Sequence, residues 1–150
     1  MPSIKQQLHA LCLAYIEERI KGANQAIQFA QGAANEETKS SSGDKYETGR
    51  AMAQLEIEKI NTQLNEAKKL KQNLLQPENT TASEKVQPGS LVITNQGKFY
   101  ISIPAGQLVI NKEIYFAISP SSPIGHELLY LTTGDRFTFN KKEFIIQQIL

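Results

Sequence analysis

The chain has 150 residues, of which 40% are hydrophobic and 21% charged, and its formal net charge is +1. No stretch approaches the roughly 20 apolar residues that cross a bilayer, and the N-terminal segment lacks the apolar core of a secretory signal, so we expect a soluble, cytoplasmic protein without a membrane partner. Acidic and basic residues are interspersed without a basic stripe, so we expect direct binding to free DNA to be weak or absent.

Two long amphipathic helices are expected in the first half of the chain. Apolar residues recur at alternating steps of four and three from about residue 3 to 34, and again from about 46 to 75. The two stripes contain Ile16, Ile20, Ala23, Ile27, Ala30 and Ala34, followed by Ala53, Ile57, Ile60, Leu64, Ala67 and Leu74. The short polar turn between them predicts an antiparallel helical hairpin over residues 1–75. The single cysteine, Cys12, excludes an intramolecular disulfide and is interpreted as a packing residue.

A linker and a small sheet domain are expected after the hairpin. Residues 76–85 read QPENTTASEK, with a proline that stops the helix and a run of small polar residues. Residues 86–150 contain short strand-like runs, at 91–93, 99–103, 108–110, 114–118, 136–139 and 143–149. Ser122 can cap one short helix that begins at Pro123. The fold class is therefore α+β, a coiled-coil hairpin followed by an antiparallel sheet domain with one helix.

Two acidic residues lie at the turn of the predicted hairpin, Asp44 and Glu47 in the segment SSSGDKYETGR. One interpretation is structural, because an aspartate before a helix and a glutamate three residues later satisfy free amide groups and favour the positive end of the helix dipole. The other is chemical. Magnesium prefers few carboxylates together with waters and phosphate oxygens, so such a pair could complete a metal site in another molecule. The spacing alone is compatible with both.

The layout of the whole chain resembles the Gre family of bacterial transcript-cleavage elongation factors. The resemblance rests on the G-D-x-x-E segment at residues 43–47 and, in order, on VQPGSLV, ISPSSPIG, TTGDRFTF and FIIQQI in the C-terminal half. It implies an FKBP-like C-terminal domain that docks at the rim of the secondary channel of RNA polymerase. It also implies that the hairpin enters this channel.

The resemblance assigns a role to each candidate residue. Asp44 and Glu47 correspond to the family's tip acids, which help to hold a second Mg²⁺ and to position water while the polymerase cuts a backtracked transcript near its 3′ end. The chain would then be an accessory factor and not an enzyme, with no cofactor of its own and with Mg²⁺ only in the complex. Its partners would be RNA polymerase and the transcript 3′ end. Ser121, Ser122 and Pro123 fall at the family's docking position and are candidate partner-binding residues. The residues that could guide the RNA 3′ end do not transfer from the family, but Arg50 is a further candidate for partner binding.

Some residues depart from the family pattern. After Glu47 the chain reads TGRAMAQ where the family has N-A-E-Y, and Ser121 replaces an acid common in the docking motif. These departures suggest an alternative, a secondary-channel regulator that obstructs or remodels the channel without stimulating cleavage. A peptidyl-prolyl isomerase would need an aromatic-lined pocket, and fold alone does not imply that activity. A coiled-coil adaptor with an unrelated partner is a further alternative.

Overall fold

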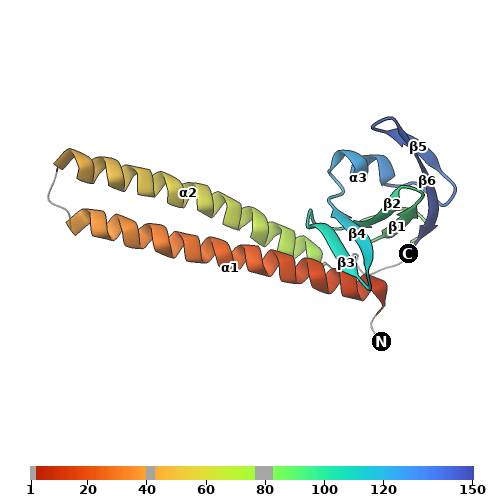
Figure 1. Cartoon of the computed structure of the whole chain (residues 1–150), viewed down its shortest axis with the longest axis horizontal. Helices are drawn as coiled ribbons and strands as arrows, with labels where there is room; N and C mark the ends of the chain where they lie inside the picture. The colour runs from red at the N-terminus through yellow and green to blue at the C-terminus, as the bar shows by residue number, and fades with distance from the viewer. Residues whose placement is uncertain (1–2, 40–42, 77–82) are drawn as a thin grey trace. The chain divides into compact units, whose positions relative to one another are not determined.

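The computed structural model describes residues 3–39, 43–76 and 83–150, with the backbone only at 33–39 and 43–47. Two long N-terminal helices precede a six-stranded, mostly antiparallel sheet with one short helix, which confirms the α+β class (Figure 1). The chain divides into two compact units, one formed by Met1–Tyr15 with Gln72–Leu150 and the other by Ile16–Lys71.

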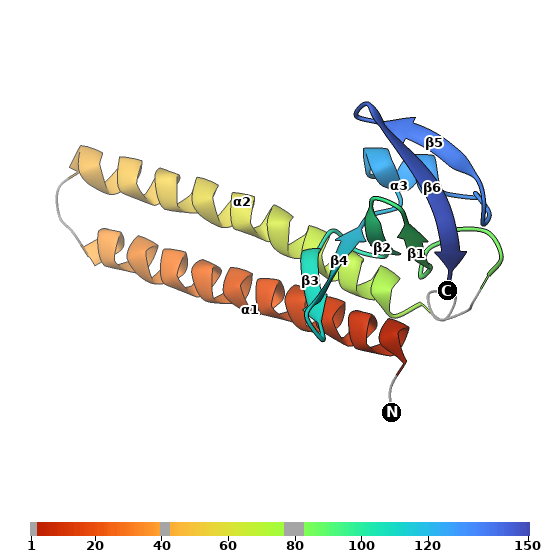
Figure 2. The ribbon, with the colours of Figure 1, turned by 45° about the vertical axis from the view of Figure 1, so that its right-hand side comes forward.

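The unit Ile16–Lys71 is an antiparallel pair formed by α1 (Ile4–Lys39) and α2 (Gly43–Leu74), which lie side by side in both views (Figures 1 and 2). Its buried apolar residues belong to the predicted stripes and are Ile16, Ala30, Ile57, Ile60, Leu64 and Ala67. α1 runs to Lys39, past the predicted end, because the residues after the last stripe position include no helix breaker. In the described part of the chain, neither long helix contains a segment apolar enough to span a membrane.

The sheet has the strand order β3-β4-β2-β1-β6-β5. Its strands are β1 (Leu91–Thr94), β2 (Gly97–Ile101), β3 (Gly106–Ile110), β4 (Glu113–Ile118), β5 (Arg136–Phe139) and β6 (Lys142–Ile149). The sheet is mostly antiparallel, as expected from the sequence, but β2 and β4 are parallel. The reason is that the β3–β4 hairpin places its second strand beside β2, so β3 becomes the edge strand.

The core of the sheet unit covers one face of β1, β2 and β6, where the short helix α3 (Pro123–Leu128) packs. Its buried members are Val86, Val92, Phe99, Ile101, Leu128, Phe144 and Ile146. The rings of Phe137 and Phe144 stack at a centroid distance of 4.9 Å. On β2, Tyr100 alternates with Phe99 and lies on the opposite face, with Cys12 of α1 close enough to affect its pKa. Leu8 and Cys12 are both fully buried. The interpretation of Cys12 as a packing residue is confirmed.

Alkaline pH should destabilise the sheet unit through these buried groups. Burial raises the pKa of Cys12 from 9.0 to about 11 and the pKa of Tyr100 from 10.0 to about 12. Since both folded-state pKa values lie above the unfolded ones, each group contributes stability that is fully present below its unfolded pKa and is lost as pH rises through its folded pKa. We expect the free energy of unfolding, measured by urea titration, to fall between about pH 9 and pH 12. The fall should be shallower in Cys12→Val, and an unchanged pH profile in that variant would contradict this assignment.

Two tight turns of the sheet use asparagine and lysine in the left-handed conformation. The φ angles are 52° at Asn111 and 68° at Lys112 in one turn, and 51° at Asn140 and 66° at Lys141 in the other. Positive φ at both central residues is the signature of the type I′ hairpin turn, which favours asparagine and then glycine. Lysine at the second position therefore satisfies the geometry at some cost in free energy.

Replacing the left-handed lysine by glycine should stabilise the sheet unit. We expect Lys141→Gly to raise the free energy of unfolding by about 0.5–1 kcal/mol, because glycine adopts positive φ without steric cost. The neighbouring exchange Lys142→Gly is the matched control, since Lys142 is the first residue of β6 and should lose stability on substitution. Chemical denaturation of both variants would measure this contrast, and a loss of stability in both would be inconsistent with it.

Candidate functional site

The predicted tip carboxylates lie at the beginning of α2. The helix starts at Gly43, so Asp44 is inside the first turn instead of immediately before the helix, and Glu47 follows within the next turn. An acid in this position is still favoured by the helix dipole. The side chains of Asp44 and Glu47 lie outside the described residues. Arg50 is exposed, about two helical turns from Gly43.

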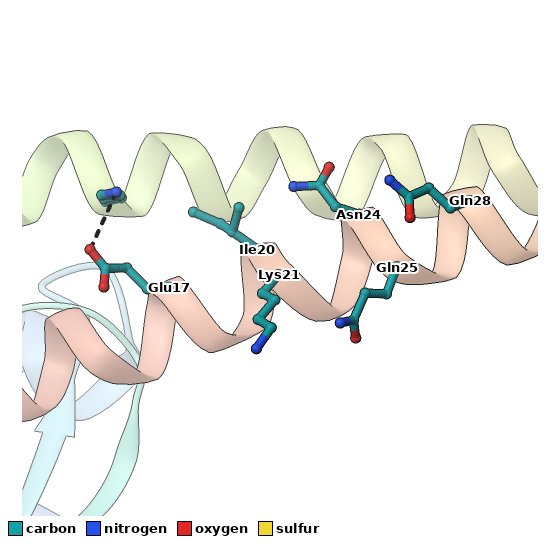
Figure 3. Close-up of a pocket in the computed structure, with 7 residues that line it drawn as sticks. Glu17, Ile20, Lys21, Asn24, Gln25 and Gln28 are labelled. Atoms are coloured by element: carbon teal, nitrogen blue, oxygen red, sulfur yellow. Dashed lines mark ion pairs between the residues drawn. The ribbon is translucent and has the colours of Figure 1, made fainter.

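The hairpin carries a shallow hollow of about 340 Å³, lined by Glu17 to Gln28 of α1 and by Lys71 of α2. Figure 3 shows Glu17 directed at Lys71, at a distance of 3.4 Å, and Asn24 extending toward α2. Both members of this ion pair are substantially exposed, so it contributes little to stability. Carboxamides and one exposed ion pair are typical of a solvated helix face, and no catalytic chemistry follows from them.

The second predicted site, Ser121–Pro123, lies at the start of α3, where several hydrogen bonds hold the chain in place. Ser122 is the N-cap residue, and its hydroxyl accepts a hydrogen bond from the amide of Gly125 at 3.1 Å and donates one to the carbonyl of Ser119 at 2.7 Å. The hydroxyl of Ser121 pairs with that of Ser119 at 2.8 Å, and Ser121 and Pro123 are exposed. Ser122 therefore maintains the shape of the loop, whereas Ser121 and Pro123 present surface.

Gly125 is required by a close approach of the chain to itself. A Cβ atom at this position would lie 2.2 Å from the carbonyl oxygen of Ser119 and 2.8 Å from the hydroxyl oxygen of Ser122. Backbone oxygen cannot yield such space without moving the loop, so only glycine fits. Gly125 is therefore a close-packing position at the start of α3.

No protein-family model matches the chain, and no functionally characterised protein matches it either. The resemblance to the Gre family therefore stays an expectation from the sequence motifs. Among the residues whose side chains are described, no three of the types His, Cys, Asp and Glu come together in a group that could hold a metal ion. Since the tip acids lie outside those residues, the two candidate sites are the acid pair at the start of α2 and the surface of the α3 loop.

Tyr130 is a surface residue that the sequence motifs did not identify. It follows Leu129, the C-cap residue of α3, and has a φ of 68° with 73% of its surface exposed. Its backbone amide donates to the carbonyl of Val86 at 2.8 Å. The sequence signal that could have identified Tyr130 is an aromatic residue directly after a short helix, at the position where glycine is most common.

The two serines of the loop should respond differently to removal of their hydroxyl groups. We expect Ser122→Ala to lower the free energy of unfolding by about 1 kcal/mol, because the amide of Gly125 loses its N-cap acceptor. Ser121→Ala is the matched control and should change stability by less than about 0.5 kcal/mol, since that side chain is exposed. Thermal or chemical unfolding measures both, and equal effects in the two variants would contradict the described hydrogen bonds.

Proposed function

We propose that the chain is a transcription elongation factor of the Gre type, which inserts its hairpin into the secondary channel of RNA polymerase and stimulates cleavage of backtracked transcripts. The observation that carries this proposal is the position of the acid pair at one end of a long hairpin, within the first five residues of α2. From Ile16 to Lys39 alone, α1 extends about 36 Å at 1.5 Å per residue. A hairpin of this kind is suited to carry two acids deep into a partner's cavity.

The small size of several seam residues supports the proposal. Ala30 of α1 and Ala67 of α2 are buried in the pair, and Ala23 and Ala53 are half-buried. Small residues between helices permit interaxial distances near the lower end of the usual range of about 8–10 Å. A hairpin with such a seam is narrower than one packed through large side chains, which favours entry into a confined channel.

The acid pair has the chemistry that the proposed reaction needs. Positions three residues apart in a helix share a face, and Asp44 and Glu47 have this spacing. Two carboxylates cannot complete the octahedral coordination of Mg²⁺, and the carboxylates of the polymerase, transcript phosphate and water would supply the remaining ligands. In two-metal phosphoryl chemistry, a second ion activates the attacking water or steadies the leaving oxygen. Asp44 and Glu47 would help to hold this ion and to orient the water.

The loop before α3 supports a separate docking role for the sheet unit. Ser121 and Pro123 are exposed, while the cap formed by Ser122 and the close approach at Gly125 fix their backbone positions. Binding residues on loops held by a rigid scaffold are common in proteins. In the proposed complex, this loop contacts the rim of the channel.

A second candidate function is a channel regulator that does not stimulate cleavage. The observation that favours it is the segment after Glu47, where Thr48 and Arg50 are exposed on α2 in place of the residues expected for the family. The same hairpin and the same docking loop would serve this function. Only the chemical outcome at the transcript end distinguishes the two candidates.

Removing both tip acids should abolish stimulated cleavage without preventing binding. We expect Asp44→Ala/Glu47→Ala to lower the rate of RNA release from a stalled, backtracked polymerase complex by about 100-fold, the scale for loss of a positioned acid–base group. The matched control is Glu56→Ala/Glu66→Ala, which makes the same change of charge at exposed positions of α2. The control should cleave like the wild-type protein, and all three proteins should bind the polymerase equally.

Each alternative outcome of this assay has a definite meaning. Full stimulation by Asp44→Ala/Glu47→Ala would refute the role of the acids. Binding of the wild-type protein without any stimulated cleavage, together with altered pausing or initiation, would instead support the channel regulator. Absence of binding to the polymerase would refute both candidates.

A further inference from the structure

We infer that Tyr130 is a partner-contact residue, and that the docking surface runs from Ser121 and Pro123 along α3 to the ring of Tyr130. The inference rests on the proposed function, because it takes RNA polymerase as the partner. The occupant that the surface favours is a neutral or cationic protein surface. Tyr130 would act by binding and has no part in the cleavage chemistry.

The first observation is that the fold imposes an unfavourable backbone conformation on Tyr130. The left-handed region costs a residue other than glycine about 1–2 kcal/mol. Hydrogen bonds pin the chain on both sides, with the amide of Tyr130 bonded to the carbonyl of Val86 at 2.8 Å and the amide of Val86 bonded to the carbonyl of Leu131 at 2.9 Å. Because these are backbone contacts, glycine could make them equally well and without the steric cost.

The second observation is that the side chain of Tyr130 makes few interactions within the chain that could offset the free-energy cost of its backbone conformation. It is 73% exposed, and among the described residues none forms a hydrogen bond with its hydroxyl or an aromatic or cation–π pair with its ring. Tyrosine is among the residues that most often dominate binding energy at protein interfaces. Backbone strain at an exposed aromatic residue therefore points to a contact outside the chain.

The third observation is the position of Tyr130 relative to the docking loop. The six residues of α3 span about 9 Å, so its two ends fit within a single interface patch of about 800 Å². Between Pro123 and Tyr130, the residues His126 and Glu127 are also exposed. Ser121 at one end and Tyr130 at the other can therefore meet the same partner.

The charge of this segment argues against a nucleic acid as the partner. Residues 119–135 contain Glu127 and Asp135 but neither lysine nor arginine. A surface that binds nucleic acid needs cations to neutralise phosphates, so this segment does not favour RNA or DNA. A neutral or cationic protein surface is complementary to it.

The test is the exchange Tyr130→Gly, studied in the full chain with purified core RNA polymerase. We expect the melting temperature to rise by about 2–4 °C as the backbone strain is relieved. We expect the dissociation constant for the polymerase to increase by about tenfold or more as the aromatic contact is lost. This combination of a more stable protein and a weaker complex separates a binding role from a structural one.

Two further variants serve as controls. Lys141→Gly makes the same change of a left-handed residue in a different turn, so it should raise the melting temperature without changing polymerase affinity. Tyr130→Phe retains the ring and the strain, and it should keep most of the affinity with an unchanged melting temperature.

The outcomes distinguish this inference from the proposed function. Equal affinities of the wild-type protein and Tyr130→Gly would overturn the inference and leave the proposed function standing. A lower melting temperature for Tyr130→Gly would overturn the strain argument on which the inference depends. If the wild-type protein does not bind the polymerase, the proposed function fails, and the inference fails with it.

Discussion

Burial of the central strand β2 on both faces is the constraint on which the sheet unit depends. Phe99 and Ile101 enter the core with α3, and the alternation of the strand places Tyr100 on the other face. Each such side chain contributes about 1.5–3 kcal/mol when it leaves water, so neither face can remain uncovered. The first turns of α1, with Leu8 and Cys12 fully buried, belong to this unit. The same uninterrupted helix goes on to form half of the hairpin, which explains why a small sheet is preceded by so long a helix.

The proposed docking loop, Ser121–Pro123, depends on this core. Leu128 is fully buried, which anchors α3, and Gly125 and Ser122 then fix the way the chain enters the helix. Leu128, Gly125 and Ser122, which provide this burial, close approach and hydrogen bonding, face the core or the loop and not the solvent. The exposed positions at both ends of α3 are therefore held in place by residues other than themselves. A surface of this kind loses little conformational entropy on binding.

Most of the fold could be predicted because its signals are periodic. The stripe containing Ile57, Ile60 and Leu64 marked α2, and alternating apolar residues marked the strands. The parallel pairing of β2 with β4 could not be predicted, because it depends on which strand of a hairpin lies beside a third strand far away in the sequence. The left-handed conformations of Lys141 and Tyr130 could not be predicted from residue preference, since they are imposed by turn and helix-end geometry. Of the candidate site, the sequence predicted the cap at Ser122 and an acid pair near the start of the second helix, but not that Asp44 lies inside the first turn of α2.

The residues most informative about function are those whose presence lowers the stability of the fold. Asp44 lies in the first turn of α2, where the helix dipole favours an acid, so its presence agrees with a structural role as well as with a chemical one. Asn140 suits its left-handed turn, because its short polar side chain tolerates that conformation. Tyr130 has no comparable stabilising role, since glycine would adopt its backbone conformation at lower free energy and most of the ring is exposed. Stability alone does not account for such a residue, whereas the proposed contact of a partner with its ring would.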